Sequence, residues 1–144
     1  MKKGSPSDQK PSPNRNSADI SQSLKELRDA FLDLHKALLE SERIGYEQAF
    51  GTIPSSGEFL QLAIRDPWFA WLRPLSEFIT LLDERLEAEE PVTSKDLHEF
   101  VKTGRSLLTP HETGQGFAKH YFDALQRDLD VVLAHGRIAK LHRK

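Results

Sequence analysis

Apolar residues recur at steps of three and four along most of the chain, which is the spacing of one face of an α-helix. The longest such pattern covers residues 19–50, where successive apolar positions are separated by 4, 3, 4, 3 and 4 residues. This pattern predicts one long helix with a single apolar face. The residues of that face are Ile20, Leu24, Leu27, Phe31, Leu34 and Leu38.

The same spacing continues in shorter segments, which predict helices over about 56–65, 67–88, 97–108, 110–127 and 130–142. Pro74 stands inside the segment 67–88, and because proline removes a backbone donor, we expect a Pro-kinked helix there. No segment alternates as a strand would, and no repeat recurs at a fixed period. The predicted fold class is all-α, a bundle of about five or six helices with one long N-terminal helix.

Two groups of residues carry packing predictions. Small residues follow the long apolar stripe at steps of four, which predicts that another element crosses this helix closely; they are Ser41, Gly45 and Ala49. The short helix 56–65 is expected to turn one face to the core, namely Phe59, Leu60, Ala63 and Ile64.

Helix starts are marked by a Ser or Thr with an acidic residue three positions later, as in a capping box. The pairs are Ser23 with Glu26, Ser55 with Glu58, Thr93 with Asp96, and Thr109 with Glu112. Asp66 before Pro67 predicts a further start, since Asp caps and Pro suits the first helical position. The last helix is expected to begin at Asp128 or Asp130, and Gly51 to end the first one.

The N-terminal segment differs in composition from the rest. Residues 1–17 are basic and rich in Pro and Ser, and residues 1–16 contain no apolar residue except Met1. We expect a disordered tail over 1–17 and a single helical-bundle domain over 18–144. The chain has no Cys, which excludes disulfides and Cys-ligated zinc. No apolar run reaches the roughly 18 residues of a membrane span, so we expect a cytoplasmic protein without a membrane partner.

Charge is segregated, although the net charge is only −2. Residues 1–16 carry +3, residues 137–144 carry +4, and residues 17–136 carry −9. The basic face at the C-terminal end consists of Arg137, Lys140, Arg143 and Lys144. It could bind nucleic acid, but the acidic body and a pI of about 6.3 make that partner unlikely.

Catalytic and metal-binding patterns are missing from the sequence. The six His residues form no H-x-x-x-H, H-E-x-x-H or E-x-x-H pattern, as helical metal sites require. G-x-S-x-G and a phosphate-binding loop are also missing. We therefore expect no catalytic residue, no metal site and no cofactor, and the sequence favours a protein that is not an enzyme.

The most distinctive stretch contains both Trp residues of the chain, Trp68 and Trp71, followed by Arg73. Trp and Arg are the residues that anchor interfaces most often. One interpretation is core packing; the other is a groove for a partner or ligand, which His35 and Tyr46 of the long helix would complete. His35 would then be a general base or pH switch rather than a residue at the edge of the core.

Three runs carry a family resemblance: D-P-W-F-A-W-L-R-P-L-S-E-F-I from Asp66, L-L-T-P from Leu107, and F-A-K-H-Y-F-D-A-L-Q-R-D from Phe117. With them the chain resembles a group of short uncharacterised bacterial all-helical proteins over about residues 24–141. The resemblance implies a single domain and a bacterial cytosolic setting, and it assigns no functional residue.

These observations favour a non-catalytic protein that acts by protein–protein interaction or by self-association as a homo-oligomer. The alternative is a bundle that binds a small molecule in a pocket near Trp68–Pro74. A weaker alternative is nucleic-acid binding through the basic termini.

Overall fold

The computed structural model describes residues 17–142, and every regular element within them is helical. Most of the predicted tail and two residues of the predicted basic face, Arg143 and Lys144, lie outside these residues. The elements in chain order are α1 (Ser17–Phe50), α2 (Ser56–Arg65), the 3₁₀ helix η3 (Pro67–Leu72), α3 (Arg73–Glu87), α4 (Ser94–Leu107), α5 (Gly116–Arg127) and α6 (Leu129–His142). The predicted all-α bundle with one long N-terminal helix is confirmed.

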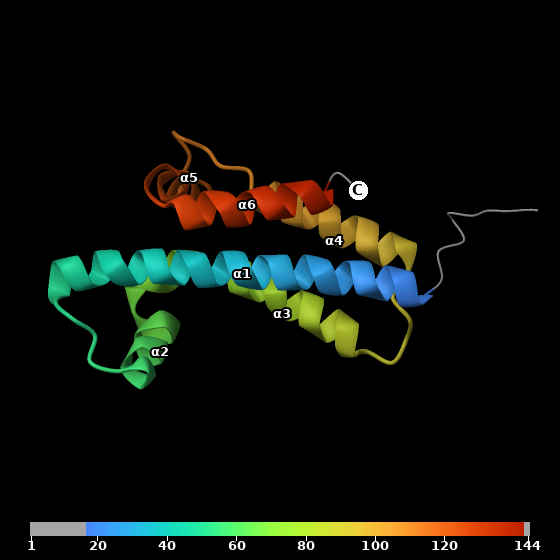
Figure 1. Cartoon of the computed structure of the whole chain (residues 1–144), viewed down its shortest axis with the longest axis horizontal. Coiled ribbons are helices and arrows are strands. Elements are labelled where there is room, and N and C mark those ends of the chain that lie inside the picture. Colours follow the sequence, from blue (N-terminus) through green and yellow to red (C-terminus); the bar gives the residue numbers. More distant parts are fainter. Residues whose placement is uncertain (1–16, 143–144) are drawn as a thin grey trace, which may run out of the picture.

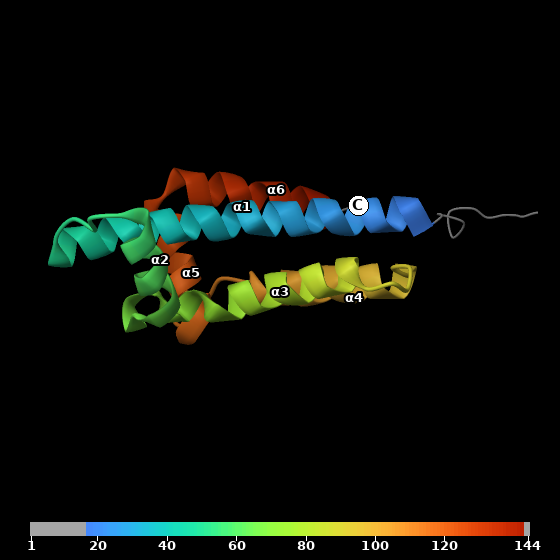
Figure 2. The same cartoon turned by 90° about the horizontal axis from the view of Figure 1, so that it is seen from below.

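Helix α1 is the spine of the fold. Its 34 residues run the length of the molecule, and α3, α4 and α6 all pack against it (Figure 1). The view from below shows α1 and α6 in one layer, with α3 and α4 in the other (Figure 2). The predicted apolar stripe of α1 is buried along its whole length between these layers, because it meets helices on more than one side.

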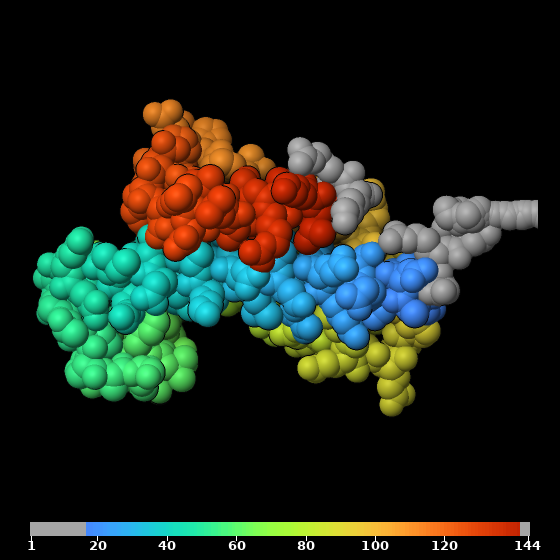
Figure 3. Space-filling view, viewed as in Figure 1, coloured from blue at the N-terminus to red at the C-terminus, as the bar shows by residue number. Residues whose placement is uncertain are grey.

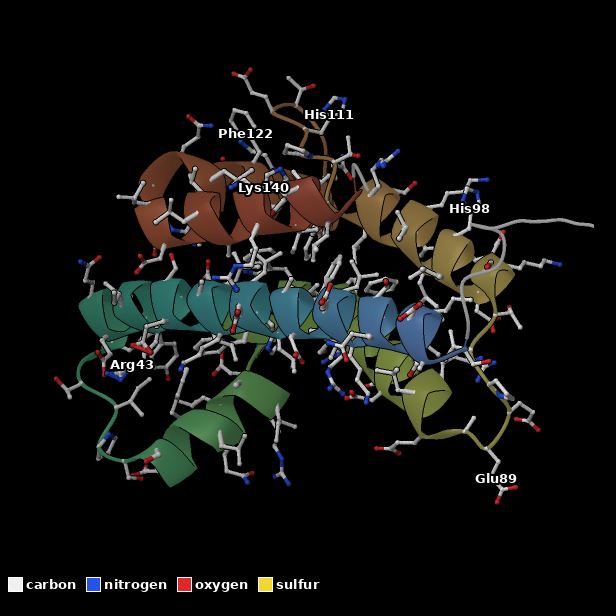
Figure 4. The ribbon with its side chains drawn as sticks, turned by 45° about the vertical axis from the view of Figure 1, so that its right-hand side comes forward. Arg43, Glu89, His98, His111, Phe122 and Lys140 are labelled. Atoms are coloured by element: carbon white, nitrogen blue, oxygen red, sulfur yellow. The ribbon has the colours of Figure 1, made fainter. Side chains whose placement is uncertain are left out.

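Helix α2 stands apart from the bundle and buries none of its residues. Only one side of it, which includes Phe59, is partly covered, and the Phe59 ring lies 5.8 Å from that of Phe69. Arg43 reaches from α1 toward α2 and lies over the Phe59 ring (Figure 4). The expected inward position of Leu60 and Ile64 is wrong: they are 57% and 58% exposed, because α2 contacts mainly η3 and meets the core only on the side that carries Phe59 and Leu62.

The segment predicted as one Pro-kinked helix over 67–88 is divided into η3 and α3. The Asp66 carboxylate accepts a hydrogen bond of 2.9 Å from the backbone N of Trp68, which confirms the predicted cap. Pro74 lies in the first turn of α3, where the missing N–H leaves no hydrogen bond broken. The chain thus accommodates the proline by changing helix type just before it.

Of the four helix starts predicted from capping boxes, two are confirmed and two are wrong. Thr93 and Asp96 form a complete capping box at the start of α4, and Ser55 caps α2. Ser23 starts no helix, because α1 is already helical from Ser17. The start predicted at Thr109 is also wrong: residues 109–115 are irregular and α5 begins at Gly116.

Candidate functional site

The five residues of the predicted groove are distributed over separate parts of the fold. Trp68 lies against α1, where its indole Nε1 donates a 3.1 Å hydrogen bond to the backbone carbonyl of Glu42. Its ring meets the Tyr46 ring edge-on at 5.9 Å. A Cβ on Gly45 would lie 3.3 Å from the Trp68 ring, so the small residue predicted at a close crossing does make room for a neighbour. This cluster fills space between α1 and η3.

Trp71 faces a different neighbour, α5. Its ring stacks on that of His120 at 5.0 Å and 16°, and it lies 5.4 Å from the ring of Phe117. Its buried Nε1 has no hydrogen-bond partner among the described residues. Arg73 is exposed. The structure therefore does not bring the two Trp side chains to one groove.

His35 is half-buried on α1, and burial lowers its pKa. Among the five predicted residues, Tyr46 lines a groove, whereas the other four line neither that groove nor the two grooves beside α4. That groove has a volume of about 320 Å³ and lies between the end of α1 and α2, with Phe50, Ile53 and Leu62 in its wall.

The predicted basic face is in part engaged by α1. Arg137 forms an ion pair with Asp33, so this charge of the basic face helps to hold α6 on α1. Lys140 is exposed on α6. Just before the N-terminal end of α6, Arg127, the last residue of α5, binds the buried Glu42 of α1 and donates a 3.0 Å hydrogen bond to Ser41. The Arg137 contact thus holds α6 on α1, and the Arg127 contacts hold the end of α5 on α1.

Sequence reasoning missed a polar pair at the junction of α5 and α6. The Tyr121 hydroxyl and His135 Nδ1 are 2.6 Å apart. Tyr121 is fully buried, and burial raises the pKa of its hydroxyl. Burial also lowers the pKa of His135, so its imidazole is neutral near pH 7. No local sequence pattern joins residues 14 positions apart on two helices.

A second missed feature is an apolar strip on the outer side of α6, formed by Leu129, Val132, Leu133 and Gly136. The three large side chains are 69%, 41% and 62% exposed, whereas Val131, Ala134 and Ile138 point into the core. Figure 3 shows α6 lying along α1 at the surface with this helix uncovered on one side. The sequence held the signal, because the first half of α6 is apolar on more than one face.

Within residues 17–142 no three His, Asp or Glu side chains gather as a metal ion would require. In the same residues no helix is both long and apolar enough to cross a membrane. Comparison with protein-family models, with curated proteins and with solved structures finds no match.

Proposed function

We propose that this protein acts by self-association, and that two copies pair through the outer strip of α6. The observation that carries the proposal is the exposure of Leu129, Val132 and Leu133 on the side of α6 opposite the core. Single exposed apolar residues are common on protein surfaces, but a contiguous apolar strip on one helix is typical of an interface.

The partner that covers this strip is a second copy of the chain, because the charges at the two ends of α6 are complementary to each other. Asp128 and Asp130 lie at the N-terminal end of α6, and Arg137 and Lys140 lie toward its C-terminal end. When the twofold axis is perpendicular to α6, the two copies of this helix run antiparallel, so the acidic end of each faces the basic end of the other. The helix dipoles are then also opposed favourably.

Gly136 adds a steric argument. A Cβ at this position would meet nothing within 4 Å, so the strip has a shallow gap at Gly136. In an antiparallel pair centred between residues 133 and 136, Leu133 of one copy faces Gly136 of the other. A large side chain set against a small one lets two helices approach closely and interdigitate.

The experiment uses the absence of Cys from the chain. Gly136→Cys places a single thiol in the strip, and the matched control Gly57→Cys places one on α2, where a Cβ would also meet no crowding. Both variants are treated at micromolar concentration with a short bis-maleimide and separated by mass.

We expect G136C to give a covalent dimer and G57C to remain a monomer, because only the first thiol lies near its counterpart. Equal cross-linking of the two variants would mean random collision and would contradict the proposal. No dimer from G136C, with complete labelling of its thiol, would contradict it as well.

A further inference from the structure

Two grooves open side by side along the seam between α4 and α6. The larger has a volume of about 780 Å³ and lies among α1, α4 and α6. The smaller, of about 470 Å³, lies between the C-terminal end of α4, the 108–110 turn and α6. Arg105 lines both grooves, and Leu141 of the larger is two residues from Ala139 of the smaller. Their volumes are in the range of small-molecule sites.

The larger groove has an apolar wall formed by residues of three helices. Leu27 comes from α1, Leu97 and Val101 from α4, and Leu141 from α6. They lie along the seam on one side of Arg105. This wall suits the hydrocarbon part of an elongated ligand, since burying such a chain removes apolar surface from water.

The smaller groove has polar groups in its lining. His135, Thr109 and Arg105 line it together, beside the apolar Ile138 and Pro110. The Thr109 hydroxyl donates to the backbone carbonyl of Arg105 at 3.0 Å, which ties the turn to the end of α4. A cation, an imidazole and a hydroxyl thus line the smaller groove, and the cation lines the larger groove as well.

The Tyr121 contact orients the His135 ring. A neutral imidazole has one N–H donor and one acceptor nitrogen. Among residues 17–142, the buried Tyr121 hydroxyl has no hydrogen-bond partner except His135 Nδ1. The hydroxyl must therefore donate to Nδ1, because otherwise its proton would be buried without an acceptor. The proton of the ring is then on Nε2, which leaves a fixed N–H donor on the side of the ring away from Tyr121.

The charges along the rim favour an anion. Lys102 and Arg105 lie on one side of α4, with His98 one turn before Lys102, and among the described residues Glu26 of α1 is the only acid that lines either groove. Figure 4 shows His98 at the rim of α4, extending away from α1. A carboxylate needs few donors, and a guanidinium is the side chain that binds it best.

We propose that this seam binds a long-chain fatty acid, with its carboxylate on Arg105 and His135 Nε2 and its hydrocarbon chain along the apolar wall of the larger groove. The charged head fits the smaller groove, whose lining includes both donors, Arg105 and His135. The hydrocarbon chain fits the wall formed by Leu27, Leu97, Val101 and Leu141. This site is independent of the outer strip of α6, which lies on another side of that helix.

The test is calorimetric titration of the full-length protein with dodecanoate below its micelle concentration, and with 1-dodecanol as a ligand of the same length without charge. Arg105→Gln removes the proposed head-group contact. Arg73→Gln is the matched control, because it removes an exposed arginine that lines neither groove. Circular dichroism checks that both variants are folded.

We expect one dodecanoate per chain, with 1-dodecanol bound at least about tenfold more weakly, since a charged hydrogen bond is lost. R105Q should weaken dodecanoate binding by a similar factor and leave dodecanol unchanged, while R73Q behaves as the wild type. Absence of dodecanoate binding, equal binding of acid and alcohol, or an equal loss in R73Q would overturn the proposal.

A second measurement decides the matter should R105Q fail to fold. The ¹⁵N spectrum of the His135 ring in the wild-type protein reports which nitrogen carries the proton. We expect the Nε2–H form, with a shift of that nitrogen when dodecanoate is added. An Nδ1–H form, or a ring unaffected by saturating dodecanoate, would contradict the proposed site.

Discussion

Gly104 of α4 lies so close to Phe31 of α1 that a Cβ on Gly104 would be 2.8 Å from Cζ of the Phe31 ring, and 3.2 Å from Cζ of Phe78. Both rings are buried and pack on each other with centroids 4.9 Å apart. The glycine therefore sets the distance at which α4 can approach the core. No other residue type fits here without moving an aromatic ring.

We predict that Gly104→Ala destabilises the protein by about 1–3 kcal/mol, as overpacking of a core does. The cost of overpacking outweighs the roughly 1 kcal/mol by which alanine stabilises a helix relative to glycine. Urea unfolding measures the difference. In the background of Phe31→Leu, which removes Cζ, the same substitution should cost less. Equal cost in both backgrounds would show that the contact with Phe31 is not the reason.

Two of the helix caps that the structure confirms, those at Thr93 and Ser55, should differ in their effect on stability. Thr93→Ala removes the cap of α4, which packs on the core, and should lower the free energy of unfolding by about 1 kcal/mol. Ser55→Ala removes the cap of α2, which buries no residue. We expect little change in global unfolding from S55A, because α2 can fray without exposing the core. Equal effects in urea unfolding would show that α2 is part of the cooperative core.

Stability should fall as the pH is lowered from about 7.5 to 5.5. Burial lowers the pKa of His35 and of His135 below 6.5 in the folded state. The unfolded chain therefore binds more protons in this range, and protonation favours unfolding. His35→Leu should reduce the pH dependence of the urea midpoint, whereas His98→Gln, at an exposed position, should leave it as in the wild type. A dependence unchanged by H35L would contradict the role of His35.

Local signals in the sequence predicted the elements whose structure depends on local interactions. Neighbouring residues supply the hydrogen bonds or the buried face in each of these cases: the apolar stripe of α1, the caps at Thr93 and Asp66, and the start of the last helix after Asp128. Thr109 shows the limit of such signals, because the same capping pattern there precedes an irregular segment.

Features that depend on how the helices pack against one another could not be predicted from the sequence. The sequence pattern of α2 shows that its apolar residues lie on one side of the helix. It does not show that Leu60 on that side remains exposed. Trp68 and Trp71 are three residues apart, and a 3₁₀ helix places such residues on the same side. They nevertheless contact different helices, α1 and α5, because η3 packs against both. The Tyr121–His135 pair arises only from the α5–α6 junction.

The central claim, pairing through the outer strip of α6, is tested most directly by the molar mass in solution. Sedimentation equilibrium of the wild type across micromolar concentrations should give a mass that approaches twice the chain mass of 16.4 kDa. Leu133→Glu should give the single-chain mass, because it places a charge at the centre of the strip. Leu60→Glu changes an equally exposed leucine on α2 and should leave the dimer intact. A wild-type mass of 16.4 kDa at every concentration, or a dimer unaffected by L133E, would contradict the account.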